Sequence, residues 1–210
     1  MNAFMQYRAI FPRYRLALGL VLVAFAATAL CFNHLPDTLP MHWDLHGQPT
    51  NYLPRWPAAW IMPITAAIVI IWLIRQLTPK RTNTIVINSV AGLMCYFSAV
   101  SLFTAMQPTE SPVPYLFMGI GVFLMAVGNI LGKLTWDYFV GLRTYWTVDD
   151  PRVWERTHRA SAPVYVLGGA AILIASLAHA SPLVPIALLL ATGLYPMLHS
   201  YIIWHRRADE

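Results

Sequence analysis

The sequence predicts an all-α integral membrane protein, a bundle of six transmembrane helices with both termini in the cytoplasm. Hydrophobic residues make up 58% of the 210 residues and charged residues only 11%, whereas a soluble domain carries about 25% charged residues. The hydrophobic residues gather in six runs, and the basic residues gather in alternate gaps between those runs. Both patterns are typical of a chain that crosses a lipid bilayer repeatedly. The bilayer is therefore the first predicted partner, and we expect residues 1–210 to form a single transmembrane domain.

Each apolar run has a length near the roughly 17–25 residues that a helix needs to cross the hydrocarbon core. Helix is expected in every run, because a lone span must pair its own backbone N–H and C=O groups inside lipid. Short gaps after the second, third and fifth runs favour antiparallel neighbours. The predicted spans are Leu16–Phe32, Pro57–Ile74, Thr84–Met106, Val113–Leu131, Ala162–Ala178 and Pro182–Trp204.

The distribution of Lys and Arg predicts the orientation of the bundle. Thirteen of the fourteen basic residues lie at the two termini or in the gaps after the second and fourth spans. The other gaps contain Arg55 as their one basic residue, against Asp37, Asp44 and Glu110. Because basic loops stay on the cytoplasmic side, residues 33–56 should be extracytoplasmic and the gap after the fourth span cytoplasmic. The net charge of +5 would suggest nucleic-acid binding in a soluble protein; here topology explains it, and no nucleic-acid partner is predicted.

The extracytoplasmic loop, residues 33–56, should be extended rather than helical, because four prolines interrupt it. Apolar and polar residues alternate through its centre, which is the period of a β-strand. Gly47 and the two residues after it are typical of a turn. We expect the apolar face, above all Trp43, to lie on the bundle or at the membrane interface. The apolar residues are Met41, Trp43 and Leu45, and the polar residues are His42, Asp44 and His46.

These three polar residues form a candidate metal site. On one face of a strand, His42, Asp44 and His46 would offer two imidazoles and a carboxylate, which suit zinc or another transition metal. The simpler alternative is a polar loop face whose histidines bond to neighbouring groups, and a pH-sensing histidine pair is a third. Zinc is therefore the one candidate cofactor.

The cytoplasmic loop after the fourth span is rich in aromatic and basic residues, which suit the lipid headgroup layer. Asp150 and Pro151 predict a helix start, with Asp at the N-cap and Pro at the first helical position, and this helix could continue into the fifth span. Trp154 and His158 lie four residues apart on it and share a face. The loop is either an interfacial anchor or a binding surface for a cytoplasmic partner, a ligand or a lipid headgroup.

Three polar side chains, Asn88, Asn129 and His199, lie near the cytoplasmic ends of their spans. Polar side chains at this depth usually face the bundle interior, so we expect them to meet there, as interhelical contacts or as the floor of a pocket with Asp137 or Arg143. No carboxylate stands in the middle of a predicted span, which argues against an ion-coupled carboxylate relay. Enzyme motifs such as HExxH and GxSxG are absent, and no catalytic residue is assigned.

Two stretches of the sequence resemble one family. The outer loop reads L-P-x-x-L-P-x-H-W-D-x-x-G-x-P from Leu35 to Pro49, which resembles the domain of unknown function at the N-terminal end of SdpI-like proteins. Residues 128–161 contain G-N-x-L-x-K, G-x-R-T-x-W-T and V-W-x-x-T-H-R, which are similar to the second signature of that family. The resemblance implies a bacterial inner-membrane protein of about six helices. It also implies a role like that of the namesake, which confers immunity to a secreted killing peptide and holds a repressor at the membrane.

The leading hypothesis is a membrane immunity or receptor protein that binds an extracytoplasmic peptide toxin or ligand and signals to a cytoplasmic regulator. A metal-dependent membrane enzyme or small-molecule transporter is the rival; it would use the His/Asp outer loop or the polar residues of the inner loop. A helical subunit without a ligand is the third reading. The candidate binding residues are His42, Trp43, Asp44, Asn129, Asp137, Arg143, Thr144, Trp146, Trp154, His158 and Arg159.

Overall fold

The structure is a computed structural model that describes residues 3–44, 47–77, 81–107, 110–136 and 140–206. Six of its helices are long and apolar enough to cross a membrane, which confirms the predicted class of a six-helix transmembrane protein. The cytoplasmic placement of both termini stays a prediction. In chain order the elements are α1 (Ala3–Cys31), η1 (Phe32–His34), β1 (Thr38–Trp43), β2 (Pro49–Pro54), α2 (Arg55–Gln76), α3 (Arg81–Met106), α4 (Val113–Leu131), α5 (Tyr145–Asp149), α6 (Pro151–Leu177) and α7 (Leu183–Arg206).

Helix α6 begins well before the fifth predicted span. The Asp150 side chain accepts a hydrogen bond from the Arg152 N–H at 2.7 Å, and Pro151 occupies the first turn. This N-cap satisfies a backbone donor that the start of a helix leaves free. The predicted helix start and its continuation into the fifth span are therefore confirmed. The short helix α5, which precedes this start, was not predicted.

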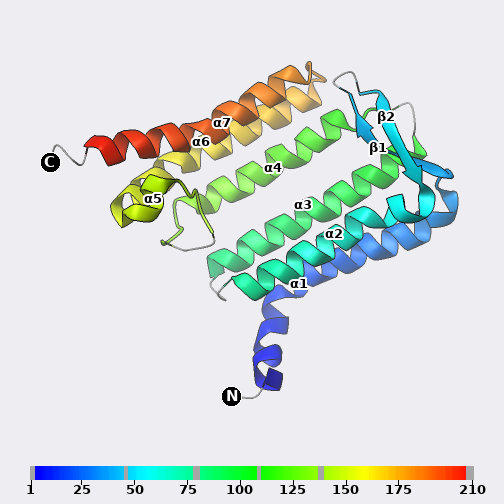
Figure 1. The fold of residues 1–210 in the computed structure, drawn as a ribbon, viewed down its shortest axis with the longest axis horizontal. Helices are drawn as coiled ribbons and strands as arrows, with labels where there is room; N and C mark the ends of the chain where they lie inside the picture. Colours follow the sequence, from blue (N-terminus) through cyan, green and yellow to red (C-terminus); the bar gives the residue numbers. More distant parts are fainter. Residues whose placement is uncertain (1–2, 45–46, 78–80, 108–109, 137–139, 207–210) are drawn as a thin grey trace. The chain divides into compact units, whose positions relative to one another are not determined.

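The chain folds into two compact units, an N-terminal unit of residues 1–119 and a C-terminal unit of residues 120–210. In the N-terminal unit α1, α2 and α3 run side by side, and the β1–β2 hairpin lies at one end of them (Figure 1). In the C-terminal unit α6 and α7 form an antiparallel pair (Figure 1). Helix α4 runs through the boundary between the units. The prediction of one domain stays a prediction.

The hairpin confirms the predicted extended segment and turn. Strands β1 and β2 pair antiparallel, with irregular register between Pro40 and Trp43. Asp44 N–H donates to the Gln48 carbonyl at 2.9 Å, and Gly47 has a φ of 78°, which favours glycine. Burial of large aliphatic side chains, each worth roughly 1.5–3 kcal/mol, holds the hairpin to α2 and α3. The buried cluster consists of Leu35, Leu39, Ala58, Ala59, Leu102 and Ala105.

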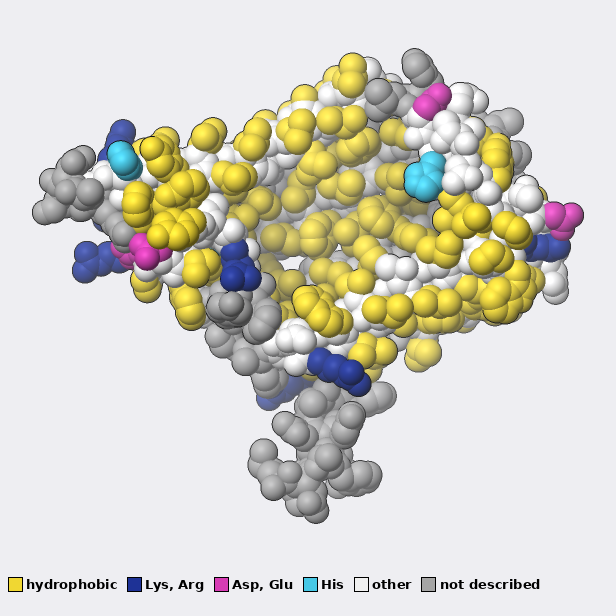
Figure 2. Space-filling view, in the orientation of Figure 1, with side chains coloured by type: hydrophobic (Ala, Val, Ile, Leu, Met, Phe, Trp, Pro, Cys, Tyr) yellow, Lys and Arg dark blue, Asp and Glu magenta, His cyan; other side chains and the backbone are white. Residues whose placement is uncertain are grey.

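Glycines allow α4 and α6 to approach closely within the C-terminal unit. A methyl group on Gly121 would overlap the Gly169 carbonyl, and one on Gly128 would overlap the Val166 backbone. Small residues at such contacts are typical of helices that pack in lipid. Figure 2 shows hydrophobic side chains over the visible faces of the helices, with Lys, Arg, Asp and Glu toward their ends. This surface suits contact with the bilayer.

Candidate ligand-binding site

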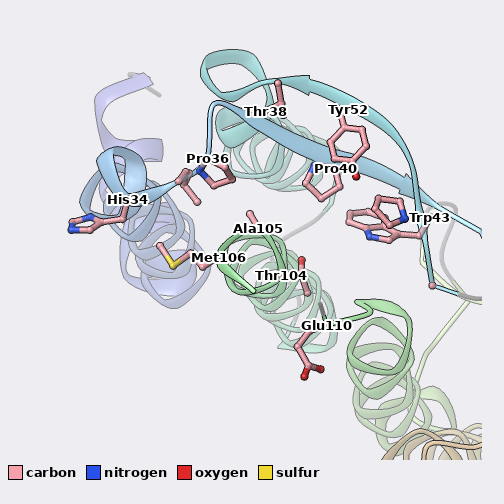
Figure 3. Close-up of a pocket in the computed structure, with 13 residues that line it drawn as sticks. His34, Pro36, Thr38, Pro40, Trp43, Tyr52, Thr104, Ala105, Met106 and Glu110 are labelled. Atoms are coloured by element: carbon pink, nitrogen blue, oxygen red, sulfur yellow. The ribbon is translucent and has the colours of Figure 1, made fainter. Parts of the chain in front are cut away.

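A cleft of about 450 Å³ opens between the hairpin and the end of α3. Pro40, Trp43 and Tyr52 project from the hairpin, while Thr104 and Met106 come from the last turn of α3 (Figure 3). The volume falls in the range of roughly 300–1,000 Å³ that small-ligand sites occupy, and such sites are mostly apolar with a few polar groups. The walls of this cleft meet that description. We call it the hairpin cleft.

Arg55 fixes the hairpin onto the N-terminal unit. Its guanidinium forms an ion pair with Asp37 at 2.7 Å and donates to the Phe32 carbonyl at 3.4 Å. The guanidinium also lies over the Phe32 ring, 5.5 Å from the ring centroid, which is cation–π geometry. In the sequence, Arg55 is notable only as the one basic residue among the acidic residues of the extracytoplasmic gaps. This observation marks Arg55 as unusual, but it does not predict that Asp37 and Phe32 are its partners.

The structure places the three outer candidates differently. His42 and Asp44 are exposed, whereas Trp43 is half-buried and lines the hairpin cleft. The Asp44 carboxylate accepts a hydrogen bond from the Gln48 N–H at 2.8 Å, so it stabilises the turn. The predicted alternation of polar and apolar faces is confirmed for these residues. Of the three, only Trp43 lies where it would touch a ligand in the cleft.

The zinc site stays a prediction. His46 lies outside the described residues, so its distance to His42 and Asp44 is not defined. Among the residues that the structure describes, no group of three His, Cys, Asp or Glu side chains is placed to hold a metal ion.

The buried rings of Trp154 and His158, with Gly141 packed against them, form a cluster that we call the clamp. It holds Leu134 and Leu142 of the inner loop to α6. Trp154 and His158 are 1% exposed, and their rings stack with centroids 4.0 Å apart. His158 Nε2 accepts from the Leu142 N–H at 2.8 Å, while Nδ1 lies 2.8 Å from the Trp154 carbonyl. This geometry fits a neutral imidazole with its proton on Nδ1. Trp154 Nε1 donates to the Leu134 carbonyl at 3.2 Å, and Gly141 packs so closely that a methyl group would overlap both rings.

Helix α5 is tied to α7 by a second set of contacts. Thr144 and Thr147 form a capping box at the start of α5. The Thr144 hydroxyl also donates to Ser200 Oγ at 3.0 Å, and Trp204 Nε1 donates to the Asp149 carboxylate at 3.1 Å. Within the second signature, Trp154 and His158 thus form a buried structural pair that holds Leu134 and Leu142, while Thr144 joins α5 to α7.

The other inner candidates lie nearer the surface. Arg143 is exposed and lines an open hollow of about 490 Å³ beside α5. Trp146 is half-buried and packs edge-on against Tyr201 at 5.2 Å. Arg159 is exposed and pairs with Glu155 at 2.7 Å. Of these three candidates, Arg143 and Arg159 are the exposed ones.

Two expectations for the inner polar residues end differently. Asn129 is exposed on α4, so the expectation that it faces the interior with His199 is wrong; the glycine face of α4 takes the contact with α6 instead. Asp137 lies outside the described residues, and its place in a pocket with the inner polar residues stays a prediction.

The comparisons with known proteins match both signatures. Residues 19–67 match a family described as a domain of unknown function (DUF1648), and residues 133–200 match the SdpI/YfhL protein family. The chain is 23% identical over 163 residues to the "Immunity protein SdpI" of Bacillus subtilis (strain 168), covering 75% of this chain and 78% of that protein. No solved structure matches the chain. The hairpin cleft is built in part by the first match, and the Trp154–His158 clamp lies in the second.

Proposed function

The chain is an SdpI-like multi-pass membrane protein, and from that premise we propose that it protects a bacterial cell by binding an extracytoplasmic peptide at the hairpin cleft. The cleft is the single observation that carries the proposal. It is large enough to bury several side chains of a peptide, and Trp43 and Tyr52 supply rigid aromatic surface for contact at a low entropic cost. The proposal places the cleft outside the inner membrane, as the distribution of basic residues predicts.

The hairpin favours recognition by side chains over addition of a third strand. A peptide that extends a sheet must exchange backbone hydrogen bonds with an edge strand. Pro40 interrupts β1, while Pro49 and Pro54 lie at the two ends of β2. Proline has no N–H to donate, and prolines on edge strands oppose pairing. The ligand is therefore expected to bind in the cleft against α3.

Signalling to a cytoplasmic regulator is the finer part of the proposal. A ligand shifts a conformational equilibrium only if it binds the two states with different affinity. The hollow beside α5, lined by Arg143, Tyr145 and Asp149, offers exposed charged and aromatic groups that a regulator would contact. The clamp beneath it would transmit a movement of α6 or α7 to that surface.

Survival of a sensitive strain tests the proposal. The chain is expressed in Bacillus subtilis that lacks its own SdpI and is exposed to the killing peptide. The wild-type chain and the Trp72→Ala variant should raise survival at least tenfold, because Trp72 is an exposed side chain of the apolar helix α2, away from the cleft. Trp43→Ala should abolish protection at equal expression. Protection that survives Trp43→Ala would refute the cleft as the site, and absence of protection by the wild-type chain would refute the immunity role.

A further inference from the structure

Three buried polar atoms in the C-terminal unit stand without partners. Thr157 Oγ1, Ser161 Oγ and His199 Nδ1 form no hydrogen bond with any residue that the structure describes. Thr157 and Ser161 are both 0% exposed. Helical hydroxyl groups can donate to the carbonyl four residues back, as Ser176 and Thr192 do in these same two helices. An unpaired buried donor or acceptor lowers stability, so we expect each of these atoms to have a partner that the described residues do not supply.

The register of α6 and α7 predicts where these atoms lie in their shared interface. Gly168 of α6 packs directly against the Thr192 side chain of α7, and the two helices are antiparallel. Ser161 precedes Gly168 by about two turns, and His199 follows Thr192 by about two turns, at 3.6 residues per turn. This register places Ser161 and His199 at the same level of the interface, on the faces that carry Gly168 and Thr192. Thr157 lies about one further turn along the Ser161 face of α6.

Pro196 adds a polar backbone group to this interface. Proline has no N–H, so it cannot donate to the Thr192 carbonyl as a regular helical residue would. Both Pro196 and Thr192 are buried. In membrane helices, carbonyls freed in this way are paired again by neighbouring side chains or by ordered water.

We propose that water is bound between α6 and α7 at the site formed by Thr157, Ser161, His199 and the Thr192 carbonyl. Water accepts from the two hydroxyls and donates to the carbonyl and to an unprotonated imidazole nitrogen, so one kind of molecule satisfies every group. None of the four groups carries a fixed charge, which makes an uncharged guest a better fit than an ion. The bound water is a structural part of the helix pair.

Nuclear magnetic resonance of the whole protein in detergent tests the occupancy directly. With ¹⁵N-labelled histidine, the ring signals of His199 are assigned by their loss in the His199→Gln variant. A cross-peak between those ring signals and water is expected in the wild-type protein. Its absence would overturn the proposal, and this measurement does not depend on a variant that folds well.

The Ser161→Ala variant tests whether the water stabilises the fold. If water joins Ser161 to His199, removal of the hydroxyl leaves both with a missing bond, and the melting temperature should fall by about 2–4 °C. Ser176→Ala is the matched control, because the Ser176 hydroxyl already bonds to its own helix, to the Ile172 carbonyl at 2.8 Å; its melting temperature should stay near that of the wild type. In a dry interface, Ser161→Ala would remove an unpaired hydroxyl. An unchanged or higher melting temperature for Ser161→Ala would therefore overturn the proposal.

Discussion

Replacement of Gly141 by alanine should unfold the inner clamp. Gly141 has a φ of 139°, a conformation that costs a side chain about 1–3 kcal/mol. The added methyl group would overlap the Trp154 ring and His158 Nε2, and overpacking of this kind costs about 1–3 kcal/mol. Displacement of His158 would also remove its bond with the Leu142 N–H, worth about 1 kcal/mol. Together we expect a loss of roughly 3–7 kcal/mol.

Thermal unfolding in detergent measures this loss. For a chain of this length, 1 kcal/mol corresponds to about 2–4 °C, so the melting temperature of Gly141→Ala should fall by at least about 6 °C. Fluorescence is a suitable signal, because the buried indole of Trp154 becomes exposed. Gly193→Ala is the matched control: Gly193 lies within α7 with open space around it, and alanine there should stabilise the helix by about 0.5–1 kcal/mol. Equal melting temperatures for the two variants would refute the clamp as the reason for the glycine.

Three further results are expected. Arg55→Ala should destabilise the N-terminal unit by about 1–2 kcal/mol in a denaturant titration, because a bonded guanidinium is lost. Asp37→Asn removes one exposed partner and should cost below about 1 kcal/mol. A larger loss for Asp37→Asn than for Arg55→Ala would contradict the role of Arg55 in fixing the hairpin. If the outer loop binds zinc, elemental analysis of purified protein should give stoichiometric metal that disappears in His42→Ala; metal retained by that variant, or none in the wild type, would exclude the site. A fluorescent protein fused to the C-terminus should fluoresce in the cytosol, while a periplasmic reporter inserted at Gly47 should be active, and the opposite pattern would invert the topology.

The features that the sequence predicts well are those that depend on residues close together in the chain. Six apolar runs specify spans, because every backbone group of a lone helix must bond within its own run. The alternation around Trp43 specifies a strand, and Gly47 specifies its turn, because both depend on residues that are close in the chain. The capped start of α6 at Asp150 is local for the same reason.

Contacts between distant residues leave no such local pattern. The Thr144 hydroxyl reaches Ser200 over 56 residues of sequence, and neither residue differs from an ordinary polar side chain at a helix end. The hairpin cleft is a similar case. The sequence identifies Trp43 as part of the apolar face of a strand. The opposite wall of the cleft includes Thr104, which lies at the end of a different span. The length of that span does not indicate which loop packs against its end.

In the inner loop, aromatic residues of similar chemistry occupy different environments. Its many aromatic and basic residues favour an interfacial anchor, and the exposed rings of Trp136 and Tyr145 (44% and 74% exposed) fit that reading. Trp154 has the same side-chain chemistry yet is 1% exposed, because Gly141 allows the backbone to approach its ring. A tryptophan side chain can be buried in the protein as well as placed at the membrane interface, provided that its N–H has a hydrogen-bond acceptor. For Trp154 that acceptor is the Leu134 carbonyl. The glycine, not the tryptophan, is therefore the residue that distinguishes a clamp from an anchor in this loop.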